Sequence, residues 1–253
     1  MYICVELIIR SVTKNNIMCK YLRETMPMKN KLIFFYSELY GYYSDHIHSR
    51  LDGFFEIEGI QIDNLVNDNK GHTFFGGVSI KIELIIQKIR ENMGEFITFS
   101  DATIFINSTH APLLGEWIDT YKEYDLCFPC NGGEDKHNIG FILINCNEKT
   151  LRFFEQVLSE LQKNRGWDQQ VVNRLLMTCC PTDMKVGNFE VARICCGFDF
   201  PAQYRDTFLI YKSFIHHSTD MIANFNARLD IFRSNHLISE EEYNRYHRSA
   251  QVL

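Results

Sequence analysis

The chain has 253 residues, of which 45% are hydrophobic and 13% aromatic, enough to bury the core of one large α/β domain or of two small ones. It carries 26 basic and 32 acidic residues, a formal net charge of −6. That balance argues against nucleic acid or an anionic membrane as the main partner.

The nine cysteines do not form a disulfide framework of the kind found in small secreted proteins, because their number is odd and they are scattered. No apolar run reaches the roughly eighteen residues that a membrane span requires. The opening segment Met1–Ile9 is short and has no basic region before it, which is unlike a signal peptide. We therefore expect a cytoplasmic protein without a membrane span, from a bacterium or in the host cytoplasm of a large virus.

Residues 1–30 contain two basic clusters and little periodicity, so we interpret them as an N-terminal extension before a domain at residues 31–250. The apolar run Leu32–Tyr36 predicts a buried strand. A helix is expected over Tyr42–Leu51, and the alternating pattern of Phe54–Ile62 predicts a second strand.

The clearest helix is predicted at Ser79–Asn92, with an apolar stripe of isoleucines and Ser79 as its N-cap. The preceding Gly76-Gly77 pair suggests a phosphate-binding loop, although the spacing is that of neither the G-x-G-x-x-G motif nor the P-loop. Lys81 falls in the first turn of this predicted helix. It is either a solvated lysine or one that meets a diphosphate or a sheet carboxylate.

Asp101 follows the apolar residues Phe96, Ile97 and Phe99, which predict a buried strand, and a second apolar run begins at Ile104. A carboxylate between two apolar runs is costly to bury unless it has a partner. Open α/β sheets bind ligands beyond the carboxyl ends of their strands, so a metal ion or ribose hydroxyls are suitable partners. The alternative is that Asp101 belongs to a turn or caps a helix.

Apolar periodicity predicts the remaining elements: a helix at Trp117–Tyr124, strands at Asp125–Pro129 and Gly140–Ile144, helices beginning near Leu151 and Trp167, and a strand at Phe208–Ile215. The tail is expected to be helical, and Ser239 starts a capping-box sequence. Strands that alternate with helices are typical of an α/β fold with a parallel sheet and crossover helices.

Two further groups have metal-binding residue types. Cys127 and Cys130 have Cys-x-x-Cys spacing, but no second pair at zinc-finger spacing follows, so we interpret them as core cysteines. His216-His217 ends a predicted strand, where an imidazole can ligate a metal held by Asp101 or can simply be a surface or core residue.

Several short sequence motifs follow one another in a characteristic order along the chain. They are a Gly-Gly-x-Ser-x-Lys helix, then Phe-Ser-Asp-Ala-Thr-Ile-Phe, Asn138-Ile-Gly140-Phe, Trp167-Asp168-Gln169-Gln170 and the late His216. This order resembles the nucleotide-diphospho-sugar transferases of the GT-A fold, especially the retaining families. The resemblance covers about Leu32 to His217. It implies a single GT-A-like domain with a mixed, mostly parallel sheet flanked by helices, and a helical C-terminal tail.

The resemblance also implies an activity: transfer of a sugar from a UDP- or GDP-sugar donor to a hydroxyl of a glycan, protein or small-molecule acceptor. By position, Asp101 and His216 take the places of metal ligands for Mn²⁺ or Mg²⁺. The catalytic positions near the sugar are Asp168 and Gln169. The positions implied for binding the donor and shaping the pocket are Asp101, Thr103, Lys81, Tyr36 and Asn138.

One position departs from the family pattern. The third residue of the acidic motif is Thr103, whereas the family has a metal-binding aspartate there. A neutral hydroxyl is a weaker ligand for a hard cation. The metal is then held weakly by Asp101, Thr103 and His216, or catalysis runs without a metal, or the activity has been lost.

Two alternatives stand beside the transferase. The first is a catalytically silent GT-A-like protein that binds a nucleotide sugar, which Thr103 favours. The second is a sugar-nucleotide nucleotidyltransferase. That class would need a basic, glycine-rich loop after the first strand, and Tyr36–Tyr43 has no such composition.

Overall fold

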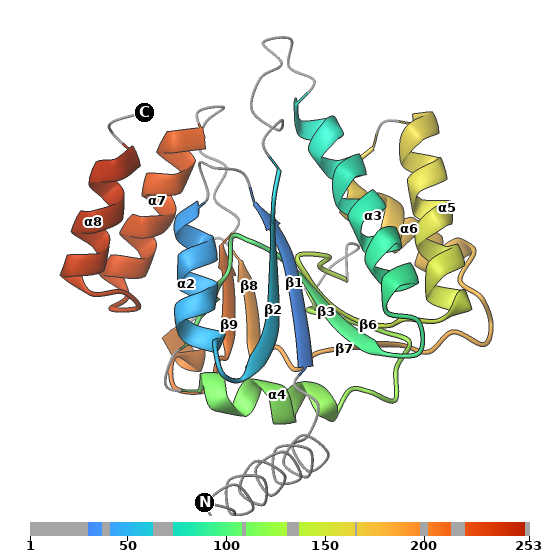
Figure 1. The fold of residues 1–253 in the computed structure, drawn as a ribbon, viewed down its shortest axis with the longest axis horizontal. Coiled ribbons are helices and arrows are strands. Elements are labelled where there is room, and N and C mark those ends of the chain that lie inside the picture. Colours follow the sequence, from blue (N-terminus) through green and yellow to red (C-terminus); the bar gives the residue numbers. More distant parts are fainter. Residues whose placement is uncertain are drawn as a thin grey trace, which may run out of the picture.

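The centre of the molecule is a six-stranded sheet with the strand order β2-β1-β3-β6-β5-β7 (Figure 1). The computed structural model describes residues 30–36, 41–62, 73–107, 110–130, 137–164, 166–197, 202–213 and 221–250. The strands are β1 (Asn30–Tyr36), β2 (Phe55–Gln61), β3 (Phe96–Asp101), β5 (Leu126–Phe128), β6 (Phe141–Asn145) and β7 (Val186–Asn188). β6 runs antiparallel to its two neighbours, and the other neighbouring pairs are parallel, so the sheet is mixed as predicted.

A smaller, three-stranded sheet has the order β4-β9-β8. Its strands are β4 (Phe105–Ile106), β8 (Ile194–Gly197) and β9 (Ile210–Ser213). Because β4 follows β3 after a few residues, the segment between them joins the two sheets. Asp101 and Thr103 therefore lie where the carboxyl end of β3 meets the second sheet.

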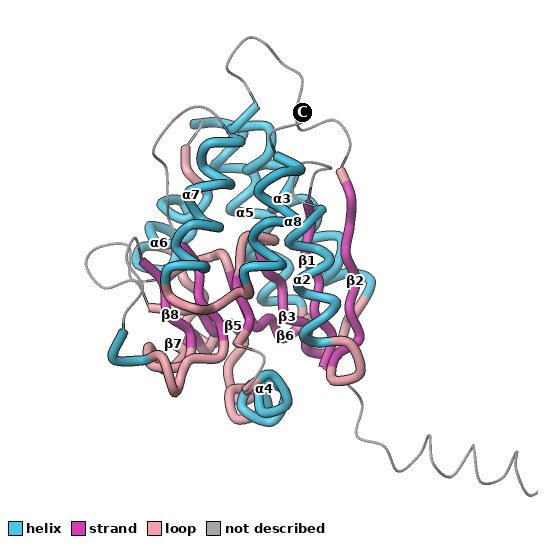
Figure 2. The backbone as a smooth tube through the Cα atoms, turned by 90° about the vertical axis from the view of Figure 1, so that its left-hand side faces the viewer, coloured by secondary structure: helices cyan, strands magenta, loops and turns pink. Residues whose placement is uncertain are grey.

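Helices cover both faces of the central sheet (Figure 1). One group contains α3 (Thr73–Glu91), α5 (Glu148–Asn164) and α6 (Asp168–Thr178). The other contains α2 (Gly41–Leu51), α7 (Met221–Ser234) and α8 (Glu240–Ala250). A further helix, α4 (Ala111–Asp119), is seen nearly end-on below the strands in Figure 2. A single 3₁₀ turn at Ala202–Tyr204 completes the elements of the described residues.

The double cover explains why β1 is a continuous apolar run instead of an alternating one. Leu32, Ile33 and Phe34 are all fully buried. Leu32 and Phe34 pack in the core that contains α2, α7 and α8, whereas Ile33 points into the core of α3, α5 and α6. Side chains alternate between the two faces of a strand, so each face needs its own apolar layer.

The start of α3 corrects the sequence prediction. The helix begins at Thr73, six residues before Ser79, so Ser79 is not its N-cap. Gly76 and Gly77 lie inside the helix, and the predicted phosphate loop is wrong. Each glycine costs about 1 kcal/mol relative to alanine in a helix interior, a penalty that the buried isoleucine stripe of this 19-residue helix can offset. Lys81 consequently lies in the third turn instead of the first.

Other boundaries also differ from the prediction. α4 begins at Ala111 and ends at Asp119, earlier than the predicted helix, because Pro112 suits a first helical turn. β9 begins at Ile210, two residues after the predicted start, while residues 214 and 215 of the predicted strand lie outside the described residues. β1 already includes Asn30, the last residue of the predicted extension. Residues 1–29 lie outside the described residues.

The predicted capping box is confirmed. The Glu242 backbone N–H donates to Ser239 Oγ at 3.1 Å, and the Ser239 N–H donates to Glu242 Oε2 at 3.0 Å. These two bonds satisfy N–H groups that the helix itself leaves without acceptors at the start of α8. Among the described residues, no helix has the combination of length and apolar character needed to cross a bilayer.

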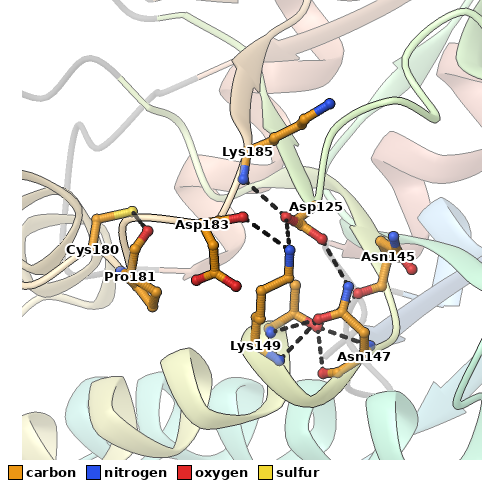
Figure 3. A network of polar contacts seen from close by, with 9 residues as sticks. Asp125, Asn145, Asn147, Lys149, Cys180, Pro181, Asp183 and Lys185 are labelled. Atoms are coloured by element: carbon orange, nitrogen blue, oxygen red, sulfur yellow. Dashed lines mark hydrogen bonds and ion pairs between the residues drawn. The ribbon is translucent and has the colours of Figure 1, made fainter.

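A polar network around Asp125 holds the chain together at one end of the strands (Figure 3). The Asp125 carboxylate accepts hydrogen bonds from Lys149 Nζ at 2.7 Å and from the Lys185 N–H at 2.9 Å. It also accepts one from Asn147 Nδ2 at 2.8 Å, and Asn147 in turn accepts N–H groups at the start of α5. The Asp125 carbonyl pairs with Asn145, which lies opposite the first residue of β3. The network therefore lies at the other end of β3 from Asp101.

Candidate active site

Asp101 is the last residue of β3 and lies at the edge where β1 and β3 end. Its N–H donates to the Gly140 carbonyl at 2.9 Å, which holds it against the start of β6. The side chain is only 25% exposed. The prediction that this carboxylate needs a partner is confirmed, because it makes two ion pairs.

The first partner is Lys81 of α3. Its Nζ lies 2.8 Å from Asp101 Oδ1 and 3.3 Å from Asp168 Oδ2, so one ammonium joins α3, β3 and α6. The Lys81 side chain is only 6% exposed. Burial alone would lower the pKa of Lys81, but Asp101 and Asp168 outweigh it and raise the pKa, so the ammonium stays charged. Of the two interpretations of Lys81, the one with a sheet carboxylate is confirmed.

The second partner, Lys212 of β9, was missed from the sequence. Its Nζ forms an ion pair and hydrogen bond with Asp101 Oδ2, and its side chain is 9% exposed. Lys212 lies directly after Ile210 and Tyr211, which are both fully buried. A lysine in such an apolar strand is costly to bury without an acceptor, and this is the signal that could have pointed to it.

Gly140 makes room for Lys212. A Cβ at position 140 would lie 2.7 Å from Lys212 Cδ and would collide with the rest of the side chain. Asn138 is fully buried, and its Oδ1 accepts the Gly140 N–H at 2.8 Å, which fixes the turn into β6. Asn138 therefore holds Gly140 in place beneath Lys212.

Hydrogen bonds fix Asp168 and the start of α6 that carries it. Its Oδ1 accepts the Gln169 N–H at 2.9 Å at the first turn of α6, where a carboxylate also suits the helix dipole. Asn173, one turn later, exchanges hydrogen bonds with the backbone of His137 at 3.0 and 2.8 Å. Because His137 leads into β6, these bonds keep the start of α6 next to the sheet edge.

Two aspartates and two lysines meet at this site, and their charges determine the pKa values there. We call Asp101, Asp168, Lys81 and Lys212 the charged cluster. Burial alone would raise the pKa of Asp101, but the Lys212 and Lys81 ammonium groups outweigh it and hold that pKa well below its usual range. Asp101 is thus ionised at neutral pH.

Other predicted residues lie nearby without joining the charged cluster. Tyr36 ends β1 at the same edge, Thr103 follows two residues after Asp101, and Gln169 follows Asp168. In the described part of the chain, their side chains make no hydrogen bond or ion pair with the cluster. His216 lies outside the described residues. The structure therefore brings together Asp101, Lys81 and Asp168 and adds Lys212.

The charged cluster does not fit the divalent metal that the resemblance implies. Both carboxylate oxygens of Asp101 already accept an ammonium, and Thr103 offers only a neutral hydroxyl. A divalent cation 4 Å from one ammonium is repelled by about 8 kcal/mol at an effective dielectric of about 20. Among the described residues, no three His, Cys, Asp or Glu side chains are grouped to hold a metal.

Of the two Cys-x-x-Cys residues, Cys127 lies in the core as predicted, whereas Cys130 is only partly buried. Cys127 is fully buried, and burial raises the pKa of its thiol to about 12, so it is a poor metal ligand or nucleophile at neutral pH. Cys130 faces His137 across an isolated antiparallel bridge.

Comparison with known proteins decides the family. Residues 38–223 match the family model of nucleotide-diphospho-sugar transferases, which is well over half of the chain. The chain belongs to the nucleotide-diphospho-sugar transferases. Its enzyme class is therefore that of a glycosyltransferase. No curated protein sequence matches the chain significantly.

Solved structures of other glycosyltransferases share the fold of this transferase. One involved in the glycosylation of the major capsid of PBCV-1 aligns with a TM-score of 0.56 at 11% identity, covering 82% of this chain and 100% of the other. GlyE of Streptococcus pneumoniae TIGR4 gives 0.50 at 15%, covering 88% and 64%. The bifunctional glycosyltransferase WbbM gives 0.51 at 10%, covering 83% and 52%. The transferase thus spans about two thirds of GlyE and half of WbbM, and the predicted GT-A-like fold is confirmed.

Proposed function

We propose that this transferase cleaves a UDP- or GDP-sugar and passes the sugar to an acceptor hydroxyl of a glycan, protein or small molecule, with retention of the anomeric configuration. The observation that supports this best is the ammonium of Lys81, which joins Asp101 and Asp168 at the carboxyl edge of the sheet. In open α/β sheets this edge is where ligands bind.

The diphosphate is expected beside Asp101 and the transferred sugar beside Asp168. When the bond between the anomeric carbon and the diphosphate oxygen breaks, its electron pair leaves with the diphosphate. Positive charge then develops on the sugar ring, and a carboxylate held in place stabilises it. The acceptor hydroxyl attacks the anomeric carbon and gives its proton to the departing diphosphate. Asp168 is suited to stabilise the positive charge on the sugar ring, because Lys81 and the Gln169 N–H fix its carboxylate.

The test is a panel of nucleotide sugars incubated with the protein, with release of nucleoside diphosphate as the readout. For the donor that is cleaved, the anomer of the first sugar product is read by proton NMR. Asp168→Asn should lower turnover by about 100-fold or more while the KM for the donor changes little. Asp183→Asn is the control, since that exposed side chain lies outside the charged cluster.

A product of inverted configuration would overturn the retaining mechanism. The catalytically silent binding protein is the second candidate, and Thr103 is the observation that favours it. It would be established by donor binding without any release of nucleoside diphosphate over hours.

A further inference from the structure

Lys212 lies where a metal-dependent transferase would need its cation, on the strand-end carboxylate of Asp101. We infer that the Lys212 ammonium supplies the positive charge that meets the donor's diphosphate, so that this transferase works without a divalent metal. The inference rests on the proposed function and adds the group that recognises the diphosphate. It also accounts for Thr103, because without a metal the second acidic ligand is not needed.

The chain is built to bring this lysine to the sheet edge. Lys212 is carried by β9, where it pairs with Cys196 of β8, and its stem crosses directly over Gly140, the residue before β6. The φ angle of Gly140 is not in the left-handed region, so glycine is needed there for space and not for its backbone conformation. The Lys212 ammonium can therefore reach Asp101 only because position 140 has no side chain.

Asp101 positions Lys212 without preventing it from binding phosphate. An ammonium has three N–H donors, so the bond to Asp101 Oδ2 does not exhaust them, and Lys212 can donate to one phosphate oxygen as well. Lys81 stays on Asp101 Oδ1, so the carboxylate keeps a cationic partner throughout. As the bond between sugar and diphosphate breaks, negative charge grows on the leaving phosphate oxygen. A fixed ammonium next to that oxygen stabilises this charge without giving up a proton of its own.

The experiment is calorimetric titration of UDP, GDP, ADP and CDP and of the matching monophosphates, in EDTA and again in millimolar Mn²⁺. For the nucleoside diphosphate that binds, the wild-type Kd should agree within about twofold between the two conditions. Lys212→Met should weaken diphosphate binding about 30-fold in EDTA, as expected for one charge-assisted hydrogen bond to phosphate. Binding of the monophosphate should stay the same, which also shows that the variant is folded.

Two further variants complete the test. Gly140→Ala keeps the lysine but displaces it, and it should weaken diphosphate binding in the same selective way. Lys149→Met is the matched control, because Lys149 makes the same kind of ion pair with Asp125 at the other end of β3. It should leave the Kd unchanged.

The outcomes separate the inference from the proposed function. Diphosphate binding that requires Mn²⁺, or that is unaffected in Lys212→Met, would overturn the role of Lys212 and leave the transferase standing. No binding of any nucleotide in either condition would overturn the proposed function and the inference with it.

Discussion

At the scale of single residues, Lys81 is the cation on which the proposed site depends, because it serves two carboxylates from one buried position. Lys81→Met leaves Asp168 without its ion-pair partner and Asp101 with Lys212 alone. Removing one member of a buried ion pair typically destabilises a protein by about 3–5 kcal/mol. We expect the lower end of that range in urea unfolding at pH 7, together with loss of donor turnover.

The control for Lys81 lies on the same helix. Lys88 is also buried and pairs with Glu58 and Glu91. Lys88→Met should destabilise the protein but leave kcat/KM for the donor unchanged once the protein is folded. Equal losses of turnover in both variants would show that Lys81 has only a structural role.

His46 gives a prediction for pH. Its Nε2 accepts the Ile106 N–H at 3.1 Å, and burial, with a smaller effect of Arg50, lowers the pKa of His46 to about 3. The unfolded chain takes up this proton near pH 6.5, whereas the folded protein does so only near pH 3, so stability falls as the pH drops between these values. Between pH 7 and pH 5 this one residue should remove about 2 kcal/mol of the free energy of unfolding.

His46→Gln keeps a hydrogen-bond acceptor but cannot titrate. Its unfolding free energy, measured by urea titration, should therefore fall less than that of the wild type between pH 7 and pH 5. The same fall in both proteins would contradict a buried neutral His46.

At the scale of elements, the Asp125 network holds β5, β6 and the start of α5 together and lies away from the charged cluster. Burial alone would raise the pKa of Asp125, but Lys149, the Lys185 N–H and Asn147 outweigh it and lower the pKa. The stabilisation is therefore present at neutral pH and is lost as the pH falls below the ordinary aspartate value of about 4.

Asp125→Asn should lower the unfolding free energy at pH 7 by about 1–3 kcal/mol, since hydrogen bonds and an ion pair are weakened. The difference from the wild type should shrink below about pH 4. Donor affinity should not change. Thermal unfolding across pH checks the stability, and a nucleotide titration checks the affinity. A large loss of affinity would show that the Asp125 network and the charged cluster do not act independently.

At the scale of the whole molecule, the sequence predicts what local patterns encode. Apolar runs located β1, β3 and β6, and the order of motifs pointed to Asp101, Asp168 and Lys81. The start of α3 was missed because Gly76-Gly77 looked like a helix boundary, whereas the long buried stripe carries the helix through both glycines. Lys212 was missed because its partner Asp101 lies 111 residues earlier, and only the folded arrangement of β9, Gly140 and β3 brings the two together.

The central claim is that the charged cluster around Asp101 is the active site. The most direct measurement is the initial rate of nucleoside-diphosphate release from the cleaved donor in EDTA, compared among the wild type, Asp101→Asn and the control Asp125→Asn. The rate of Asp101→Asn is expected to be lower by about 100-fold, because the variant no longer holds the two ammonium groups in place, while the control keeps the wild-type rate. A wild-type rate in Asp101→Asn would contradict the account.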